Sequence, residues 1–365
     1  MLKQTLKKIF LKRKLLLAVL LLVLIETGIG VFEAANAFPT ELDRATYQRL
    51  VSHFAGPLSD AKRAELETEQ LLFENARELQ EYLTDAVRSS VIDPEDYQND
   101  SALLSAYLRG RGGYEAFLED VSYAESGTDR QLVNRVGWTF LLEKERVDIL
   151  LCMVLLLFVI VSEVSENETN FRLLRRTTVF GKKKTHILNV TVGVCLAAAL
   201  SAVIMGIRFL LAWKLLGLTG GSAPAESLSM FQNTAYGSLT VSQAFLFVSG
   251  IRILGAMGYT ALCFLFGAVF LSSLTAALGG VLTVILPPYI LSSPALYYVS
   301  PVSLLLGTGF LFGRVSETVG EQEEKAEIVF SVAAGKPALY FSVIFAVLLI
   351  FSALLFAERK EENRR

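Results

Sequence analysis

The sequence predicts an all-α membrane protein in which six transmembrane helices carry a mostly helical extracytoplasmic domain, inserted between helices 1 and 2. Three observations lead to this prediction. The 365 residues are 53% hydrophobic with a mean hydropathy of +0.47, too apolar for an ordinary soluble domain. Apolar runs close to the length of a bilayer core alternate with polar segments. Residues 34–146 are instead rich in charge, with apolar side chains at helical spacing.

The first predicted span follows a basic amino terminus. Residues 1–14 hold six Lys or Arg and no acid, and the apolar run from Leu15 to Phe32 follows directly. At about 1.5 Å per residue this run crosses a bilayer core. A cleaved signal peptide is the alternative, because Ala35-Asn36-Ala37 matches a cleavage pattern. We expect a retained helix, because the run exceeds the roughly 7–15 apolar residues of a usual signal peptide.

Residues 34–146 are expected to form the extracytoplasmic domain. Ser59 is a predicted N-cap, and it opens a helix in which Leu66 and Leu71 are expected to face a core. Turn signals at Asp93-Pro94 and at 110–113 separate the helices. The 21 acids of this segment outnumber its 12 Lys and Arg, which fits a translocated domain.

Five further apolar runs complete the predicted bundle. Arg252 interrupts the fourth span, which predicts an interfacial lead-in before a span that begins near Ile253. Pro287 and Pro288 lie in the fifth span and predict a bent helix packed inside the protein. The predicted boundaries are 1–33 (amino terminus and first span), 34–146 (extracytoplasmic domain), 147–164 (second span), 165–186 (cytoplasmic loop), 187–213 (third span), 214–240 (outer loop), 241–272 (lead-in and fourth span), 274–296 (fifth span), 297–337 (outer re-entrant or loop segment), 338–357 (sixth span) and 358–365 (cytoplasmic tail).

Basic segments orient the predicted bundle. The amino terminus, the stretch 163–189 and the carboxyl tail are the basic ones. Because cytoplasmic loops of membrane proteins carry an excess of Lys and Arg, all three are expected in the cytoplasm. An even number of spans satisfies this, so the sequence predicts a multi-pass protein of the cell membrane with both termini inside.

The Gly181-Lys182 step is the nearest approach to a nucleotide-binding motif. A P-loop requires glycine five residues before this step and Ser or Thr directly after it. Those positions hold Arg176 and Lys183, so no nucleotide site is predicted. The sequence has neither a G-x-S-x-G nor an H-E-x-x-H motif, and we expect no catalytic residues.

Histidines and cysteines give no metal or cofactor prediction. His53 and His186 are far apart and have no ligand cluster beside them. All three cysteines lie in apolar runs and are expected to pack as small hydrophobic residues: Cys152, Cys195 and Cys263. We therefore expect no metal and no cofactor. Nucleic acid is not an expected partner, because a basic loop beside two spans is the ordinary product of topology and of anionic headgroups.

The basic stretch 163–189 is the segment most informative about function. It contains an acid, a leucine pair, arginines, a threonine pair and a Gly-Lys step, in that order, before the third span. This order resembles the cytoplasmic loop of the ABC-2 type permease subunits of ABC transporters. The order of spans, with a large outer insertion after the first, is also similar, and so is Ser300-Pro301-Val302 before the last span. This chain has Thr178 where the family often has proline, and Asn189 where it often has lysine.

The resemblance implies a transport subunit, favoured as an exporter, whose ATP hydrolysis takes place on a separate cytosolic ATP-binding cassette ATPase. It also implies a dimer with a second copy or a paralogue, surrounded by membrane lipids. The loop would be a coupling loop that docks on the ATPase through Glu166, Leu173, Leu174, Arg175, Arg176, Thr177, Gly181 and Lys182. For the two leucines, burial against the protein's own interfacial helix is the alternative.

Glu26 is the one acid well inside an apolar run. It lies about 18 Å along a helix from Lys14, and an ionisable group there indicates a functional site. Together with Pro287 and Pro288 it is a candidate for a translocation path or a dimer interface. The alternative places Glu26 near the outer headgroups beside a partner such as Arg208, which is expected to snorkel at the outer end of its span.

Two other functions stay open. A receptor or sensor would bind an extracellular ligand through residues 34–146, and an intramembrane enzyme would need paired catalytic residues, which do not stand out. Six spans with a bent helix favour transport over sensing. The substrate and the direction of transport do not follow from the residues.

Overall fold

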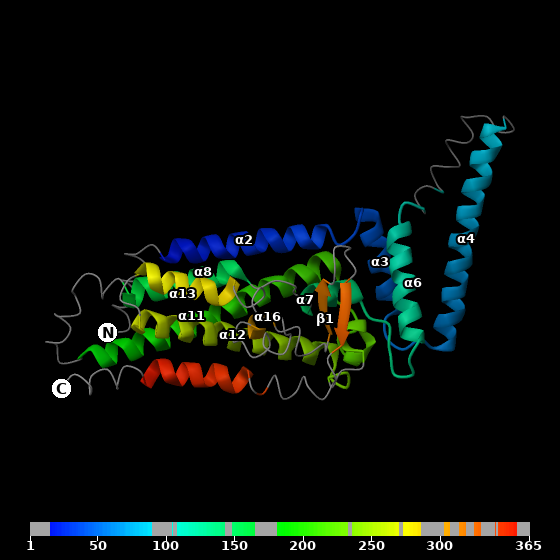
Figure 1. Cartoon of the computed structure of the whole chain (residues 1–365). Coiled ribbons are helices and arrows are strands. Elements are labelled where there is room, and N and C mark those ends of the chain that lie inside the picture. Colours follow the sequence, from blue (N-terminus) through cyan, green and yellow to red (C-terminus); the bar gives the residue numbers. More distant parts are fainter. Residues whose placement is uncertain are drawn as a thin grey trace.

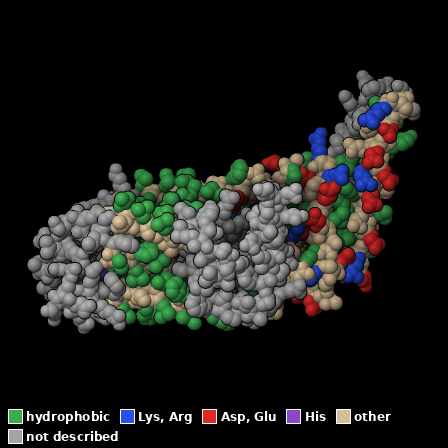
Figure 2. Space-filling model, in the orientation of Figure 1, with side chains coloured by type: hydrophobic (Ala, Val, Ile, Leu, Met, Phe, Trp, Pro, Cys, Tyr) green, Lys and Arg blue, Asp and Glu red, His purple; other side chains and the backbone are tan. Residues whose placement is uncertain are grey.

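The computed structural model describes residues 15–89, 104, 108–142, 148–164, 181–232, 236–269, 273–285, 303–306, 314–318, 325–329, 340 and 342–355. Over these residues the chain is mostly helical, as predicted. Figure 1 shows a long bundle of apolar helices with a group of polar helices at one end. Figure 2 shows hydrophobic side chains over the visible part of the bundle and charged side chains gathered on the polar helices.

Three helices are long and apolar enough to cross a membrane: Leu15–Ala35, His186–Leu216 and Val241–Val269. Three shorter apolar helices lie beside them, at Ile149–Ser162, Ser273–Val284 and Ser342–Leu355. The corresponding elements are α2 (Leu15–Ala35), α8 (Ile149–Val159) with the π-helical turn η2 (Ile160–Val164), α11 (Gly181–Leu211) with the π-helical turn η3 (Ala212–Leu216), α12 (Val241–Val269), α13 (Ser273–Ile285) and the C-terminal helix Ser342–Leu355. The six apolar helices occupy the ranges of the six predicted spans.

The core of the bundle forms where α8, α11 and α12 meet. Phe158, Tyr259 and Phe264 are almost fully buried there. A Cβ atom on Gly193 of α11 would lie 2.6 Å from the Phe264 ring, so glycine permits this close packing. Cys195 is exposed, contrary to our expectation, because it lies on the outward face of α11. The other two cysteines are buried as predicted.

Within the described residues, the polar group contains the helices α3 (Glu41–Phe54), α4 (Asp60–Arg88) and α6 (Arg111–Glu125), and its hydrophobic core includes Tyr47, Phe54 and Phe117. The predicted N-cap is confirmed, since the Ser59 hydroxyl accepts a hydrogen bond from the Lys62 amide.

The predicted core face of α4 is half right. Leu66 is buried, but Leu71 is 58% exposed. Five residues at about 100° each turn the helix by about 140° beyond a full turn, so these two leucines lie on different faces. The core face of α4 continues instead through Phe73, which is two turns beyond Leu66.

The remaining described elements are short. They are α7 (Arg135–Leu142), the two 3-10 turns η4 (Ala225–Ser227) and η5 (Ser229–Phe231), α16 (Ser303–Leu306), and the antiparallel strands β1 (Arg314–Thr318) and β2 (Lys325–Val329), in which Arg314 pairs with Val329. The strand pair is a local addition within 297–337, which was predicted as a re-entrant or loop segment, and the described chain remains mostly helical.

Two predicted helix boundaries also change. The helix of the third span begins at Gly181 and not at Ile187, so the last six residues of the predicted loop 165–186 are helical. The fourth span is continuous from Val241 to Val269, with Arg252 in its middle. The helix is therefore not interrupted at Arg252, and the interfacial lead-in that should end near Ile253 stays a prediction. The helix has no reason to break, because the Arg252 charge finds buried partners, described below.

The apolar helices run alternately up and down the bundle (Figure 1). The start of α2, the start of α11 and the end of the C-terminal helix lie together at one end. The polar helices α3, α4 and α6 lie at the opposite end. The basic stretch 163–189 therefore joins α8 to α11 at the end where the described chain begins and ends.

Candidate functional site

Most predicted docking residues fall outside the described residues. These are Glu166, Leu173, Leu174, Arg175, Arg176 and Thr177, and the same holds for Pro287 and Pro288 of the fifth span. Gly181 and Lys182 lie in the first turn of α11. The structure thus describes the base of the basic stretch, and the geometry of that base is informative.

The two ends of the basic stretch are tied together. The side-chain amide of Asn189, on α11, donates a hydrogen bond to the carbonyl of Ser162 at 3.1 Å. Both residues are buried. Ser162 lies in the π-helical turn η2, a distortion that is frequent at functional sites. A neutral amide suits this buried position better than a lysine, whose charge would need a partner there.

His186 ties the same base to the C-terminal helix. Its ring Nε2 lies 3.0 Å from the carbonyl of Ala353, and the ring meets Phe264 of α12 edge-on at 6.3 Å. The side chain is buried. Among the described residues, no group of three His, Cys, Asp or Glu side chains is placed to hold a metal. His186 therefore links the start of α11 to α12 and to the C-terminal helix.

Glu26 is buried in α2, covered by side chains of this chain itself. That position favours an inward-facing role over one on a surface between two copies. The partner suggested for it, Arg208, forms its ion pair with Glu33 instead, at 3.0 Å. Glu33 lies two turns further along the same face of α2. Arg208 is also buried, so the prediction that it snorkels is wrong.

Two buried arginines meet the carboxyl end of α7. Arg252 donates to the carbonyls of Leu141 and Leu142, at 3.1 and 2.9 Å. Arg208 donates to the carbonyl of Phe140 at 3.2 Å, with its guanidinium 4.7 Å from the centre of the Phe140 ring. The last carbonyls of a helix have no partner within the helix, and cations are favoured near them. This explains how α11 and α12 each carry an arginine inside the bundle.

The amino end of α7 is fixed by different groups. The Asn134 side-chain oxygen accepts from the Gly137 amide at 2.7 Å, as an N-cap does. The nitrogen of the same side chain donates to the carbonyls of Leu216 and Gly217, at 2.9 and 2.8 Å. Gly217 has φ of +75°, a conformation that favours glycine. One asparagine thus joins α7 to the end of the third span.

Arg135 joins α7 to α6. Its Nε lies 2.6 Å from Asp120 Oδ1, in the geometry of an ion pair and not of a hydrogen bond, and its Nη2 lies 2.7 Å from Glu119. Asp120 also accepts from the Tyr47 hydroxyl of α3 at 2.5 Å. Burial raises the pKa of Asp120 to about 6, although Arg135 and the Tyr47 hydroxyl act to lower it. Burial and the Asp120 charge raise the pKa of Tyr47.

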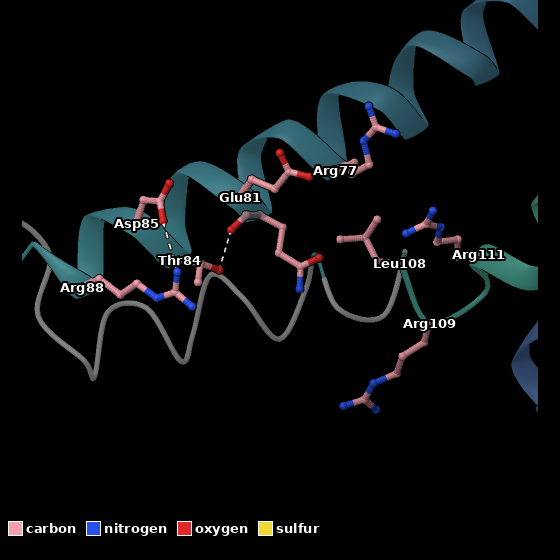
Figure 3. A pocket seen from close by; sticks show the side chains of 9 residues that line it. Arg77, Glu81, Thr84, Asp85, Arg88, Leu108, Arg109 and Arg111 are labelled. Atoms are coloured by element: carbon pink, nitrogen blue, oxygen red, sulfur yellow. Dashed lines mark hydrogen bonds and ion pairs between the residues drawn. The ribbon is translucent and has the colours of Figure 1, made fainter.

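An arginine-rich cleft of about 540 Å³ lies between the end of α4 and the start of α6 (Figure 3). Its lining residues are Arg77, Gln80, Glu81, Thr84, Asp85, Arg88, Leu108, Arg109 and Arg111. All four arginines are exposed. Two of them already face acids, Arg88 with Asp85 at 3.6 Å and Arg111 with Glu115 at 2.6 Å. Exposed and partly paired charges of this kind attract an anion only weakly.

Sequence reasoning missed the joint at α7. The signal for it was an asparagine placed just before a short apolar run, Asn134 before Trp138 to Leu142, which is an N-cap pattern. Its partners Arg252 and Asp120 are distant in the sequence and could not be paired with it from one chain. Comparison with family models, curated proteins and solved structures finds no match.

Proposed function

We propose that this chain is the membrane-spanning permease subunit of an ABC-2 type exporter, powered by a separate cytosolic ATPase subunit. The observation that carries the proposal is the base of the 163–189 stretch. Its two ends are hydrogen-bonded to each other at the end of the bundle opposite the polar helices. A basic loop held in this way is suited to receive force from a docked protein and to pass it to the helices on both sides.

Six spans are proposed from the six apolar helices. Three of these are long enough alone, and the other three need flanking residues to cross a core of about 30 Å. Their alternate directions place both ends of the described chain beside the basic stretch. With Lys and Arg enriched on the cytoplasmic side, this end lies in the cytoplasm and residues 34–146 form the extracytoplasmic domain. A dimer with a second copy or a paralogue completes the permease.

The proposed mechanism assigns the docking residues by chemistry. Leu173 and Leu174 bind in an apolar groove on the ATPase, while Glu166, Arg175 and Arg176 fix the position of the loop along that groove. Nucleotide binding favours one of two helix arrangements because the docked loop makes different contacts in each. Displacement of the loop reaches α8 and α11 through the hydrogen bond between Asn189 and Ser162, and it reaches the C-terminal helix through His186.

A receptor or sensor is the second candidate function. The observation in its favour is that the polar helices have a hydrophobic core of their own, distinct from the core clusters of the bundle. Such a domain is able to bind a ligand and signal inward. A receptor of this kind requires no ATPase, which separates the two candidates by experiment.

Copurification tests the proposal. The full-length tagged protein is solubilised from its own cells in a mild detergent, and bound proteins are identified by mass spectrometry. An ATP-binding cassette ATPase in near-equal amount is expected. Leu173→Glu should abolish its recovery, because a charge replaces an apolar anchor. Leu71→Glu, the same change at an exposed site on α4, should leave it bound. Recovery of no ATPase, or equal recovery with Leu173→Glu, would overturn the proposal.

A further inference from the structure

The helix α7 is a joint between the outer helices and the apolar bundle that is anchored by polar groups, beside the chain connection from α2 to α3 and the hydrogen bond from Gln48 of α3 to the Leu215 carbonyl. It has only eight residues, yet the groups at both of its ends are held by side chains from other elements. At its amino end Arg135 reaches α6, and the Val136 amide donates to the Tyr47 hydroxyl of α3 at 3.4 Å. At its carboxyl end it receives Arg208 from α11 and Arg252 from α12. Four other helices are therefore attached to it.

α7 has no room to slide between these attachments. A Cβ atom at Gly137 would lie 2.5 Å from the carbonyl of Gly217. The Trp138 indole donates to the Thr219 carbonyl at 2.9 Å, and Leu141 and Leu142 are fully buried against the start of α12. Packed interiors transmit displacement and do not absorb it. A shift of α6 must consequently move α7 or break its contacts.

The buried arginines make the attachment to the bundle hard to break. Arg252 is 3% exposed and Arg208 is 6% exposed. Pulling α7 away would break the bonds of both arginines to its three carbonyls, and buried groups that lose such bonds are costly. Moving α7 together with α11 and α12 keeps every one of these bonds. The joint therefore favours concerted motion over separation.

We infer that α7 is a coupling element through which the conformation of α3 and α6 controls that of α11 and α12. α11 continues from Arg208 to His186 and Asn189 at the base of the basic stretch. The outer helices are thereby linked with the opposite end of the bundle by one short helix and one long one. This inference does not depend on the proposed transport function, since it concerns only motion within the chain.

Hydrogen exchange on the full-length protein in lipid nanodiscs tests the coupling. Arg252→Gln removes a charge that lies on α12, and no bond described for it reaches α3 or α6. If α7 couples the two parts, amides of α6 and α3 around Asp120 and Tyr47 should exchange about tenfold faster or more. Reciprocity requires that Arg135→Gln speeds exchange in α12 around Arg252. Arg252→Lys, which keeps a charged donor, should give a smaller change.

Arg63→Gln is the matched control, because Arg63 is an exposed arginine on α4 that faces Glu125 of α6 at 3.7 Å. It should alter exchange locally and leave α12 unchanged. Faster exchange confined to α7, α11 and α12 in Arg252→Gln would show that α7 is only packed there and would overturn the inference. Should Arg252→Gln fail to fold, the Arg135→Gln arm decides alone, since Arg135 is 36% exposed whereas Arg252 is 3% exposed. Unchanged exchange in α12 for that variant overturns the inference equally.

Discussion

The joint between α6 and α7 should make the outer helices less stable as pH rises. Asp120 has an ordinary pKa of 3.8 when unfolded and about 6 in the folded protein, chiefly because it is buried. A folded pKa above the unfolded one means that the folded state binds the proton more tightly. The contribution of Asp120 to the free energy of unfolding is therefore fully present below about pH 4, and it is lost as pH rises through about 6. The difference of about two pH units corresponds to about 3 kcal/mol.

Asp120→Asn isolates this contribution, because the amide has no proton to lose in this range. Urea unfolding of the full-length protein in detergent, followed by the fluorescence of Trp138 and Trp213, gives the free energy of unfolding. The free energy of unfolding of Asp120→Asn minus that of wild type should be about 3 kcal/mol larger at pH 7.5 than at pH 4. Asp85→Asn, at a carboxylate that is 78% exposed, should show no such shift. A difference for Asp120→Asn that stays constant with pH would refute the reasoning.

Three further predictions concern packing. Gly113→Ala would place its Cβ into the backbone carbonyl of Asp43 and should lower the free energy of unfolding by about 3 kcal/mol or more. For Gly112→Ala the three nearest atoms all belong to the Asp43 side chain, and the loss should be about 1 kcal/mol. Equal losses in urea unfolding would contradict the packing of α3 on α6. A membrane-permeant maleimide should modify Cys195 faster than the two buried cysteines, and equal rates by mass spectrometry would contradict the outward face of α11. Tyr259→Phe removes a hydrogen bond of 3.2 Å to a carbonyl on α13 and should cost about 1 kcal/mol, seen as a lower melting temperature in detergent than that of wild type.

The coarse fold follows from sequence because hydrophobicity and capping are local. Apolar runs identified six helices, and a serine before a charged amphipathic run identified the start of α4. Predictions were wrong where a side chain forms hydrogen bonds with residues that are distant in the sequence. From the sequence alone, Arg252 was predicted to interrupt its helix. Carbonyls of α7, about a hundred residues away, accept its hydrogen bonds, and α12 continues through this position. The prediction that Leu71 faces the core was wrong because Leu66 and Leu71 are five residues apart, a spacing that puts them on different faces of a helix.

The candidate site was likewise predicted only in part from the sequence. The sequence order from Glu166 to Lys182 identified a loop of interest, but it carried no information about what holds the base of that loop. The bond between Asn189 and Ser162 joins two apolar helices across the stretch, and His186 finds a carbonyl on the last helix. Neither bond leaves a pattern in a single sequence, because a backbone carbonyl accepts from any donor regardless of its own side chain. Arg208 was suggested as a partner for Glu26, whereas its carboxylate partner is Glu33, two turns further along α2.

The use of arginine, and not an apolar residue, in the middle of α12 has a physical consequence. An apolar side chain at Arg252 would avoid burying a charge but would leave the end of α7 with unsatisfied carbonyls. An arginine restricts the rotation of α12 relative to α7, because its donors must reach two successive carbonyls. Through one carbonyl of α7, that of Phe140, Arg208 restricts α11. Since Asn189 lies on that helix about 28 Å from Arg208, the rotation set at α7 is also the rotation presented at the base of the basic stretch.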